Sequence, residues 1–181
     1  TPNTLILDAP YTYTNGTNIF NAARDYKGFI TAKQALAESR NIPALKVFQS
    51  VDKNKIADYV HSFGIDYGQN LYESASIGAF DGVTALEMSA AYGAYARGGY
   101  YIEPYSYTQI TYRDNGEIYV KTTKKTKVCS KKTAKYINDI LVSAASEYHN
   151  LGTLEIGSTQ AAAKTGTTTI DSKIIKALDL N

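Results

Sequence analysis

Residues 29–44 read Phe-Ile-Thr-Ala-Lys-Gln-Ala-Leu-Ala-Glu-Ser-Arg-Asn-Ile-Pro-Ala and contain two helix-start signals in close succession. Thr31 and Gln34 form a capping box, in which both side chains satisfy free backbone N–H groups at a helix start, so a short helix should run to about Ser39. Asn41 fits the N-cap of a second helix. That second helix would carry an apolar stripe made of Leu45, Phe48 and Val51.

Further helices are predicted downstream by capping residues, apolar residues at helical spacing and glycine stops. They are a helix that ends at Gly64 and carries Ile56, Tyr59, Val60 and Phe63; a helix with a capping box at Thr84 and Glu87 that stops at Gly98; and a long helix capped by Ser130 with Ile137, Leu141, Ala144 and Tyr148.

Extended structure is expected in three places. Residues 1–30 show no helical period and predict extended segments and loops. Residues 107–112 and 117–120 flank Asp114-Asn115-Gly116, a strong hairpin signal, so an antiparallel pair is expected there. Residues 164–169 are β-branched enough to predict a strand and its turn.

Composition excludes several classes of protein. The chain has 181 residues, 44% apolar and 20% charged, which is ordinary for a folded domain and excludes disorder as its main state. A net charge of +2 is too small to indicate a nucleic-acid-binding face. No apolar run is long enough to cross a membrane, and the single Cys129 cannot form an internal disulfide. We expect an interior segment of a longer protein.

Two short motifs suggest different kinds of chemistry. Lys164-Thr165-Gly166 is similar to the end of a phosphate-binding loop, but Ala163 stands where that loop needs glycine. Beside a Ser-x-Asn element such as Ser39-Arg40-Asn41, Lys-Thr-Gly instead suggests the penicillin-recognising serine acyltransferases. Alone, Ser39 and Asn41 could simply cap neighbouring helices.

The sequence around these motifs favours the second reading. Residues 29–44 resemble the Ser-x-Asn segment of the transpeptidase domain of class A, bifunctional high-molecular-mass penicillin-binding proteins. Residues 76–78 and 82–99 resemble the downstream core helix of that domain, and residues 163–168 resemble its third motif. The resemblance runs in the right order from about residue 5 to residue 169.

The resemblance implies a mixed α/β, penicillin-binding and β-lactamase-like transpeptidase fold. This chain would supply a helical subdomain and part of an antiparallel sheet. Residues 1–181 would then be the central part of one transpeptidase domain, with no second domain in the chain.

The resemblance also implies roles for individual residues. Ser39, Asn41 and Lys164 would be catalytic: Ser39 would relay a proton within reach of the Lys164 ammonium, and Asn41 would orient the substrate. Thr165, Gly166 and Thr167 would bind the substrate, and the Thr167 N–H would donate to the oxyanion. Arg40 should point toward solvent or into a structural ion pair.

One element of the family is missing. Its nucleophile lies in a Ser-x-x-Lys motif upstream of the segment that resembles residues 5–45. The Ser-x-x-Lys at Ser50-Val51-Asp52-Lys53 comes after Ser-x-Asn and lies in a polar stretch, so we interpret Ser50 as structural. The nucleophile should come from a complementary chain or segment.

The implied function is that of a D,D-transpeptidase that cross-links peptidoglycan through a serine acyl-enzyme at the outer face of the bacterial cytoplasmic membrane, with the anchor elsewhere. Its partners would be D-Ala-D-Ala stem peptides and β-lactams, with no cofactor, no metal and no nucleic acid. Two alternatives stay open: a D,D-carboxypeptidase or β-lactamase of the same superfamily, and a non-catalytic module of this kind.

Overall fold

The computed structural model describes residues 1–68, 70–79, 82–148, 157–167 and 176. The strands are β1 (Leu5–Asp8), β2 (Tyr11–Thr12), β3 (Asn18–Ile19), β4 (Gly28–Thr31), β5 (Tyr100–Ile102), β6 (Gln109–Thr111), β7 (Ile118–Val120) and β8 (Lys125–Lys127). The α-helices are α1 (Ala32–Ala37), α2 (Asn41–Gln49), α3 (Lys53–Ser62), α4 (Ala85–Ala96) and α5 (Lys131–Ser143). A 3-10 helix, η1 (Glu73–Ile77), precedes α4, and a π-helix, η2 (Ala144–Tyr148), continues α5.

The strands confirm a mixed α/β fold with antiparallel pairing. Within the described residues they form two-stranded sheets, which pair β1 with β4, β2 with β3, β5 with β8, and β6 with β7. In the first pair Leu5 lies opposite Thr31 and Asp8 opposite Gly28. Because side chains alternate across a strand, Leu5 and Leu7 point away from the face that carries Asp8, which is fully buried.

The predicted helix starts are confirmed at Thr31, Thr84 and Ser130. Each of these side chains accepts a hydrogen bond from the backbone N–H three residues later, at 3.0–3.2 Å. At Thr84 the full capping box is present. At Thr31 the second half of the predicted box is wrong, because the Gln34 amide donates to Glu38 at 2.9 Å instead of returning to the cap.

The predicted cap of the second helix is also wrong. Arg40 is the N-cap of α2, without a side-chain cap bond, and Asn41 is the first helical residue. The Asn41 side chain donates to the Phe20 carbonyl instead of capping a helix, and the left-handed turn at Ser39 leaves Arg40 as the last residue before α2. Val51 lies beyond the end of α2 and is 42% exposed, whereas Leu45 and Phe48 are buried as expected.

Buried apolar side chains form two clusters in the described part of the chain. One cluster lies under α2, and the other joins α3 to α4. Their buried members are Ile19, Ile42 and Leu45 in the first, and Phe63, Ala91 and Ala94 in the second. The helix stop predicted at Gly64 is confirmed by its left-handed φ of 73°.

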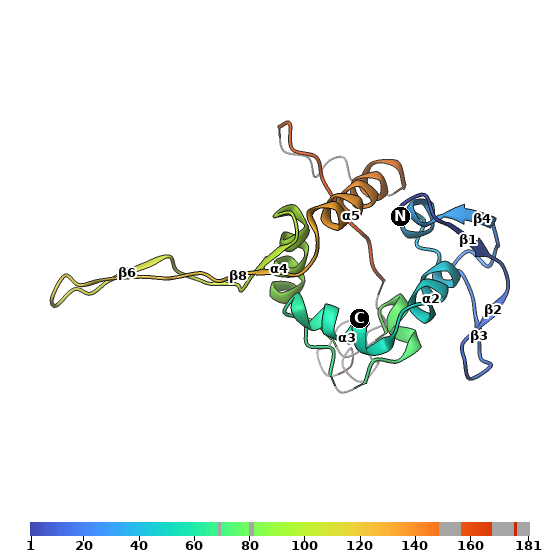
Figure 1. Ribbon diagram of the computed structural model, residues 1–181, viewed down its shortest axis with the longest axis horizontal. Helices are drawn as coiled ribbons and strands as arrows, with labels where there is room; N and C mark the ends of the chain where they lie inside the picture. Colours follow the sequence, from blue (N-terminus) through green and yellow to red (C-terminus); the bar gives the residue numbers. More distant parts are fainter. Residues whose placement is uncertain (69, 80–81, 149–156, 168–175, 177–181) are drawn as a thin grey trace.

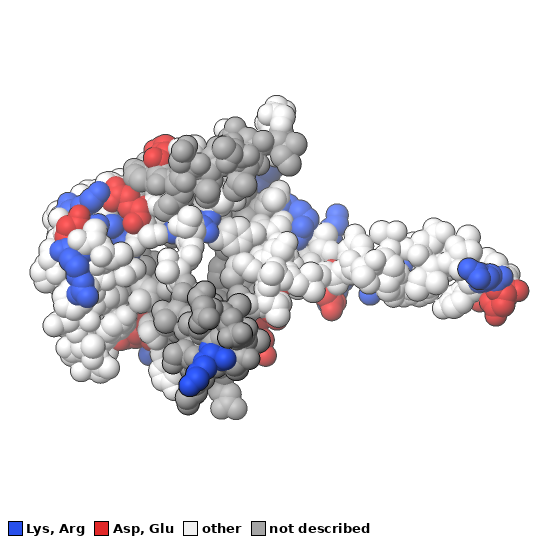
Figure 2. Space-filling model, turned by 180° about the vertical axis from the view of Figure 1, so that it is seen from behind, with Lys and Arg blue, Asp and Glu red and all other residues white. Residues whose placement is uncertain are grey.

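A long arm leaves the body beside α4 (Figure 1). The pair β5–β8 forms its root, and the predicted hairpin around Asp114-Asn115-Gly116 is confirmed as β6 and β7 farther out. Ile110 lies opposite Tyr119, and both strands are exposed along their length. Figure 2 shows the arm as a largely uncharged projection with charged side chains near its root and at its tip.

Helix α5 lies between α4 and the N-terminal part of the chain, and it packs against both α1 and α4 (Figure 1). Ala163 lies against this helix, because its N–H donates to the Leu141 carbonyl at 3.3 Å. The strand predicted over residues 164–169 is wrong for residues 164–167, which are not part of a strand. Thr168 and Thr169 lie outside the described residues.

Among the helices of the described ranges, none combines the length and the hydropathy needed to cross a membrane.

Candidate functional site

Ser39 occupies a strained turn between α1 and α2. The Ser39 N–H donates to the Leu36 carbonyl at 3.1 Å, and the Arg40 N–H donates to the Ala35 carbonyl at 2.9 Å. This pattern is a Schellman motif, which needs a left-handed residue just after the C-cap. Ser39 has a φ of 55° there, although a side chain in this conformation costs about 1–2 kcal/mol.

Other helices of the same chain use glycine at the corresponding position. Gly64 follows the C-cap of α3 with a φ of 73°, and Gly98 follows the C-cap of α4 with a φ of 66°. Strained residues that persist where an unstrained one would serve tend to cluster at functional sites. The turn therefore points to a role for the Ser39 hydroxyl.

Arg40 fixes this turn to the N-terminal strands. Its Nε and Nη2 donate to Asp8 Oδ2 at 2.8 and 2.6 Å, and its Nη1 donates to Asp25 Oδ1 at 2.6 Å. Arg40 is 6% exposed and Asp8 is fully buried. Burial disfavours the charge on Arg40, but the hydrogen bonds to Asp25 and Asp8 outweigh burial and raise its pKa. The predicted structural ion pair of Arg40 is confirmed.

Lys164 binds the Ser39 hydroxyl although the two residues lie far apart in the sequence. The Lys164 ammonium donates a hydrogen bond to Ser39 Oγ across 125 positions, and it also donates to the Thr165 carbonyl at 3.0 Å. Because α5 packs against α1 and the segment before Lys164 is bonded to α5, the helix packing brings the lysine to the Ser39 turn. Burial lowers the pKa of the Lys164 ammonium.

Asn41 lies beside this pair but points elsewhere. Its Nδ2 donates to the Phe20 carbonyl at 2.8 Å, and no hydrogen bond joins it to Ser39 or Lys164 in the described part of the chain. The remaining oxygen of the Asn41 amide accepts no hydrogen bond from a described residue. The geometry thus brings Ser39 and Lys164 together and leaves the side-chain oxygen of Asn41 available to accept a hydrogen bond.

Thr165, Gly166 and Thr167 follow Lys164 as an exposed segment. A Cβ added to Gly166 would meet no atom of a described residue within 4 Å, so the described part of the chain leaves the backbone there open to an approaching molecule. A backbone without side chain is typical of positions where a ligand lies close to the chain.

Ser50 has a structural role in α2. It is the C-cap of that helix, and its Oγ donates to the Val47 carbonyl at 2.7 Å. Its neighbour Lys53 begins α3 instead of bonding Ser50.

Asp8 and Asp25 were not singled out from the sequence, although they anchor the Ser39 turn. If Arg40 is buried it needs carboxylate partners, since a buried guanidinium without them is very unfavourable. That signal indicates that partners exist, but it does not choose among the acidic residues of the chain.

Comparison with known proteins gives a consistent family. Residues 1–174 match the family described as "Transpeptidase: Penicillin binding protein transpeptidase domain". Penicillin-binding protein 1A/1B of Bacillus subtilis is 38% identical over 178 residues, which are 96% of this chain and 19% of that protein. Penicillin-binding protein 1A of Streptococcus pneumoniae is 35% identical over 63% of this chain and 17% of its own length. The chain thus spans about a fifth of the length of these relatives.

Solved structures share the fold. Penicillin-binding protein A from M. tuberculosis, described as an imipenem acyl-enzyme complex, matches with a TM-score of 0.81 at 18% identity, over 95% of this chain and 45% of that chain. Penicillin-Binding Protein 1A from Haemophilus influenzae matches with a TM-score of 0.71 at 23% identity, over 81% of this chain and 27% of that chain.

Proposed function

The chain belongs to the penicillin-binding protein transpeptidase domain family, and on this basis we propose that it supplies part of the active site of a serine D,D-transpeptidase that cross-links peptidoglycan stem peptides. The family expected from the sequence motifs is confirmed. The observation that carries the finer proposal is the hydrogen bond between Lys164 and Ser39, made at a serine kept in a left-handed turn.

Acyl transfer needs a nucleophile, a route for its proton and donors for the oxyanion. In this proposal the nucleophilic serine comes from a segment outside residues 1–181. The Ser39 hydroxyl passes the nucleophile's proton to the leaving amine of the D-Ala-D-Ala peptide. The Lys164 ammonium, bonded to Ser39 Oγ, keeps the site positive while negative charge develops on the substrate.

The remaining residues orient the substrate. The free oxygen of the Asn41 amide accepts a hydrogen bond from the upstream segment or the peptide, while its Nδ2 stays on the Phe20 carbonyl. The hydroxyls of Thr165 and Thr167 bind the terminal carboxylate, and the Thr167 N–H is one oxyanion donor. The open backbone at Gly166 leaves space for the peptide or for a β-lactam.

The proposed substrate determines where the domain acts and which inhibitors it binds. Peptidoglycan stem peptides lie outside the cytoplasm, so the domain acts at the outer face of the bacterial cytoplasmic membrane. β-Lactams acylate the same serine, in keeping with the acyl-enzyme described for the structurally similar M. tuberculosis protein.

Labelled penicillin tests this function directly. In the protein that contains this chain, we expect one serine to be acylated, and peptide mapping should place the label outside residues 1–181. Deacylation rate and cross-linked product, measured on the same sample, separate a transpeptidase from a carboxypeptidase or β-lactamase. Label on Ser50, or no label at all, would overturn the proposal.

The pH dependence of acylation tests the role of Lys164. Because burial lowers its pKa, the ammonium loses its proton below the ordinary lysine value, so the acylation rate should fall on the alkaline side earlier than a solvent-exposed lysine would predict. In Lys164→Arg the charge persists at every pH used, and the alkaline fall should move upward. Rate profiles of the two proteins check this, and an unmoved alkaline fall would assign it to another group.

A further inference from the structure

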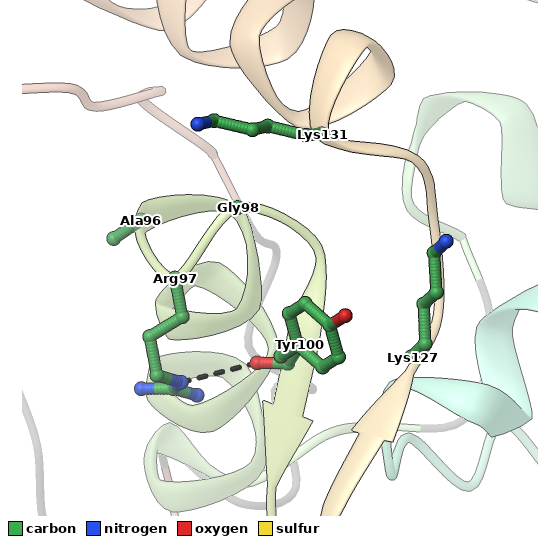
Figure 3. Close-up of a pocket in the computed structure, with 6 residues that line it drawn as sticks. All are labelled: Ala96, Arg97, Gly98, Tyr100, Lys127 and Lys131. Carbon is green, nitrogen blue, oxygen red and sulfur yellow. Dashed lines mark hydrogen bonds between the residues drawn. The ribbon is translucent and has the colours of Figure 1, made fainter.

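An open pocket lies at the root of the arm. It has a volume of about 520 Å³ and is lined by Ala96, Arg97, Gly98, Tyr100, Lys127 and Lys131. Figure 3 shows Lys131 extending from the start of α5 above the end of α4, while Lys127 comes from β8. A second pocket of about 420 Å³ adjoins it, shares Arg97 and Tyr100, and adds Lys125. None of these residues belongs to the group formed by Ser39, Asn41 and Lys164.

The charged side chains of both pockets are all cations. Lys127 and Lys131 form no ion pair with any described residue, in contrast to Lys27, which pairs with Glu38 at 2.7 Å. Arg97 is fixed in position, because its Nε donates to the Tyr100 carbonyl at 3.1 Å and its Nη2 to the Ala90 carbonyl at 3.3 Å. Among the residues that line the pocket, Arg97 is therefore held in place by hydrogen bonds, whereas Lys127 and Lys131 are free of ion pairs with the described residues.

Strand geometry continues this cationic surface from one pocket to the next. Lys125 and Lys127 are two positions apart on β8, so their side chains share one face of the strand. They lie opposite Ile102 and Tyr100 of β5. Two lysines therefore lie on the same face of β8 at the root of the arm.

This concentration of charge is local. Residues 121–135 contain seven of the chain's 19 Lys and Arg and no Asp or Glu, although the whole chain carries a net charge of only +2. In addition, α5 begins at the pocket rim, and Ser130 caps the Thr133 N–H. The N–H groups of the first helical turn and the positive end of the helix dipole favour an anion at that rim.

We propose that the surface formed by Arg97, Lys127 and Lys131, whose charged ends point in different directions (Figure 3), binds an anionic molecule that carries several phosphate groups, so that each cation contacts a separate phosphate and Lys125 contacts the next one. Arginine offers a planar fork of donors for phosphate, and lysine adds an adaptable charge. Four cations in two adjoining, open pockets suit repeated phosphates better than an isolated carboxylate. Such phosphates are available from a soluble polyphosphate-like polymer or from the headgroups of an anionic bilayer.

Binding of two probes to the complete protein tests the site and distinguishes the sources. The probes are inorganic tripolyphosphate, followed by calorimetry, and vesicles of phosphatidylcholine with or without phosphatidylglycerol, followed by co-sedimentation. The variant Lys127→Gln/Lys131→Gln removes two pocket charges, and Lys55→Gln/Lys124→Gln removes the same charge from residues that line neither pocket. Penicillin acylation should be unchanged in both variants, which separates this site from the proposed transpeptidase function.

We expect the pocket variant to weaken binding of tripolyphosphate by about tenfold or more, and the control variant by less than about threefold. Pocket-dependent binding of phosphatidylglycerol vesicles would identify the bilayer as the source, and binding of tripolyphosphate alone would identify a soluble polymer. Equal weakening in both variants would show a diffuse charge effect and overturn the proposal. Absence of binding by the unaltered protein would do the same.

Discussion

Ser39→Gly is expected to slow penicillin acylation by about 10²–10⁴-fold, the usual contribution of a positioned proton relay, without loss of stability. Glycine takes the left-handed φ of 55° without strain, as Gly64 and Gly98 do at the ends of α3 and α4. The free energy of unfolding should therefore stay the same or rise by up to about 1 kcal/mol, because relief of strain slightly exceeds the added flexibility of the unfolded chain. Stopped-flow acylation and urea denaturation of the complete protein measure the two effects.

Matched variants make this result specific. Ser39→Ala removes the hydroxyl and keeps the strain, so it should be as slow as Ser39→Gly and less stable. Since Lys164 bonds the same hydroxyl, Lys164→Ala combined with Ser39→Ala should cost less than the product of the two single losses. A Ser39→Gly protein with the unaltered rate would show that the hydroxyl takes no part in acylation.

Asp8→Ala is expected to lower the free energy of unfolding by about 3–5 kcal/mol, because it leaves the buried Arg40 guanidinium with only part of its partners. The same change should loosen the Ser39 turn, since Arg40 is the next residue and its side chain binds β1. Urea denaturation of the complete protein measures the stability, and acylation kinetics measure the effect on the turn.

The double variant Arg40→Met/Asp8→Leu is the control for this prediction. It removes both charges and keeps apolar volume in the buried space, so it should be less destabilised than Asp8→Ala alone. Lys135→Ala, which removes an exposed partner of Asp139, should change stability by less than about 1 kcal/mol. If Asp8→Ala behaved like Lys135→Ala, the ion pair would not be what fixes the turn.

Local signals predicted much of the fold. Thr31, Thr84 and Ser130 start helices because a hydroxyl oxygen binds an N–H three residues later, and this needs no information from elsewhere in the chain. The hairpin at Asp114-Asn115-Gly116 is equally local, and Gly116 has the expected positive φ of 71°. These elements could be predicted because each is stabilised by residues adjacent in sequence.

Features that depend on distant partners could not be predicted in the same way. The start of α2 follows from the left-handed turn at Ser39 and from carboxylates at Asp8 and Asp25, which lie 32 and 15 positions from Arg40. Residues 164–167 are β-branched enough to predict a strand but are not part of one, because β-propensity depends on the surroundings of a residue as much as on its type. The resemblance to penicillin-binding proteins gave Ser39, Asn41 and Lys164 as candidate site residues. Nothing in the sequence identified Asp8 and Asp25 as the partners of Arg40.

The separation of Ser39 and Lys164 has a consequence for the newly made protein. The turn at Ser39 is fixed by contacts among residues 8–42, whereas its lysine partner follows 125 positions later. At a ribosomal speed of about 5–20 residues per second, the lysine leaves the ribosome roughly 6–25 s after the serine. The contacts within residues 8–42 that fix the serine turn are therefore all synthesised well before the lysine that binds its hydroxyl.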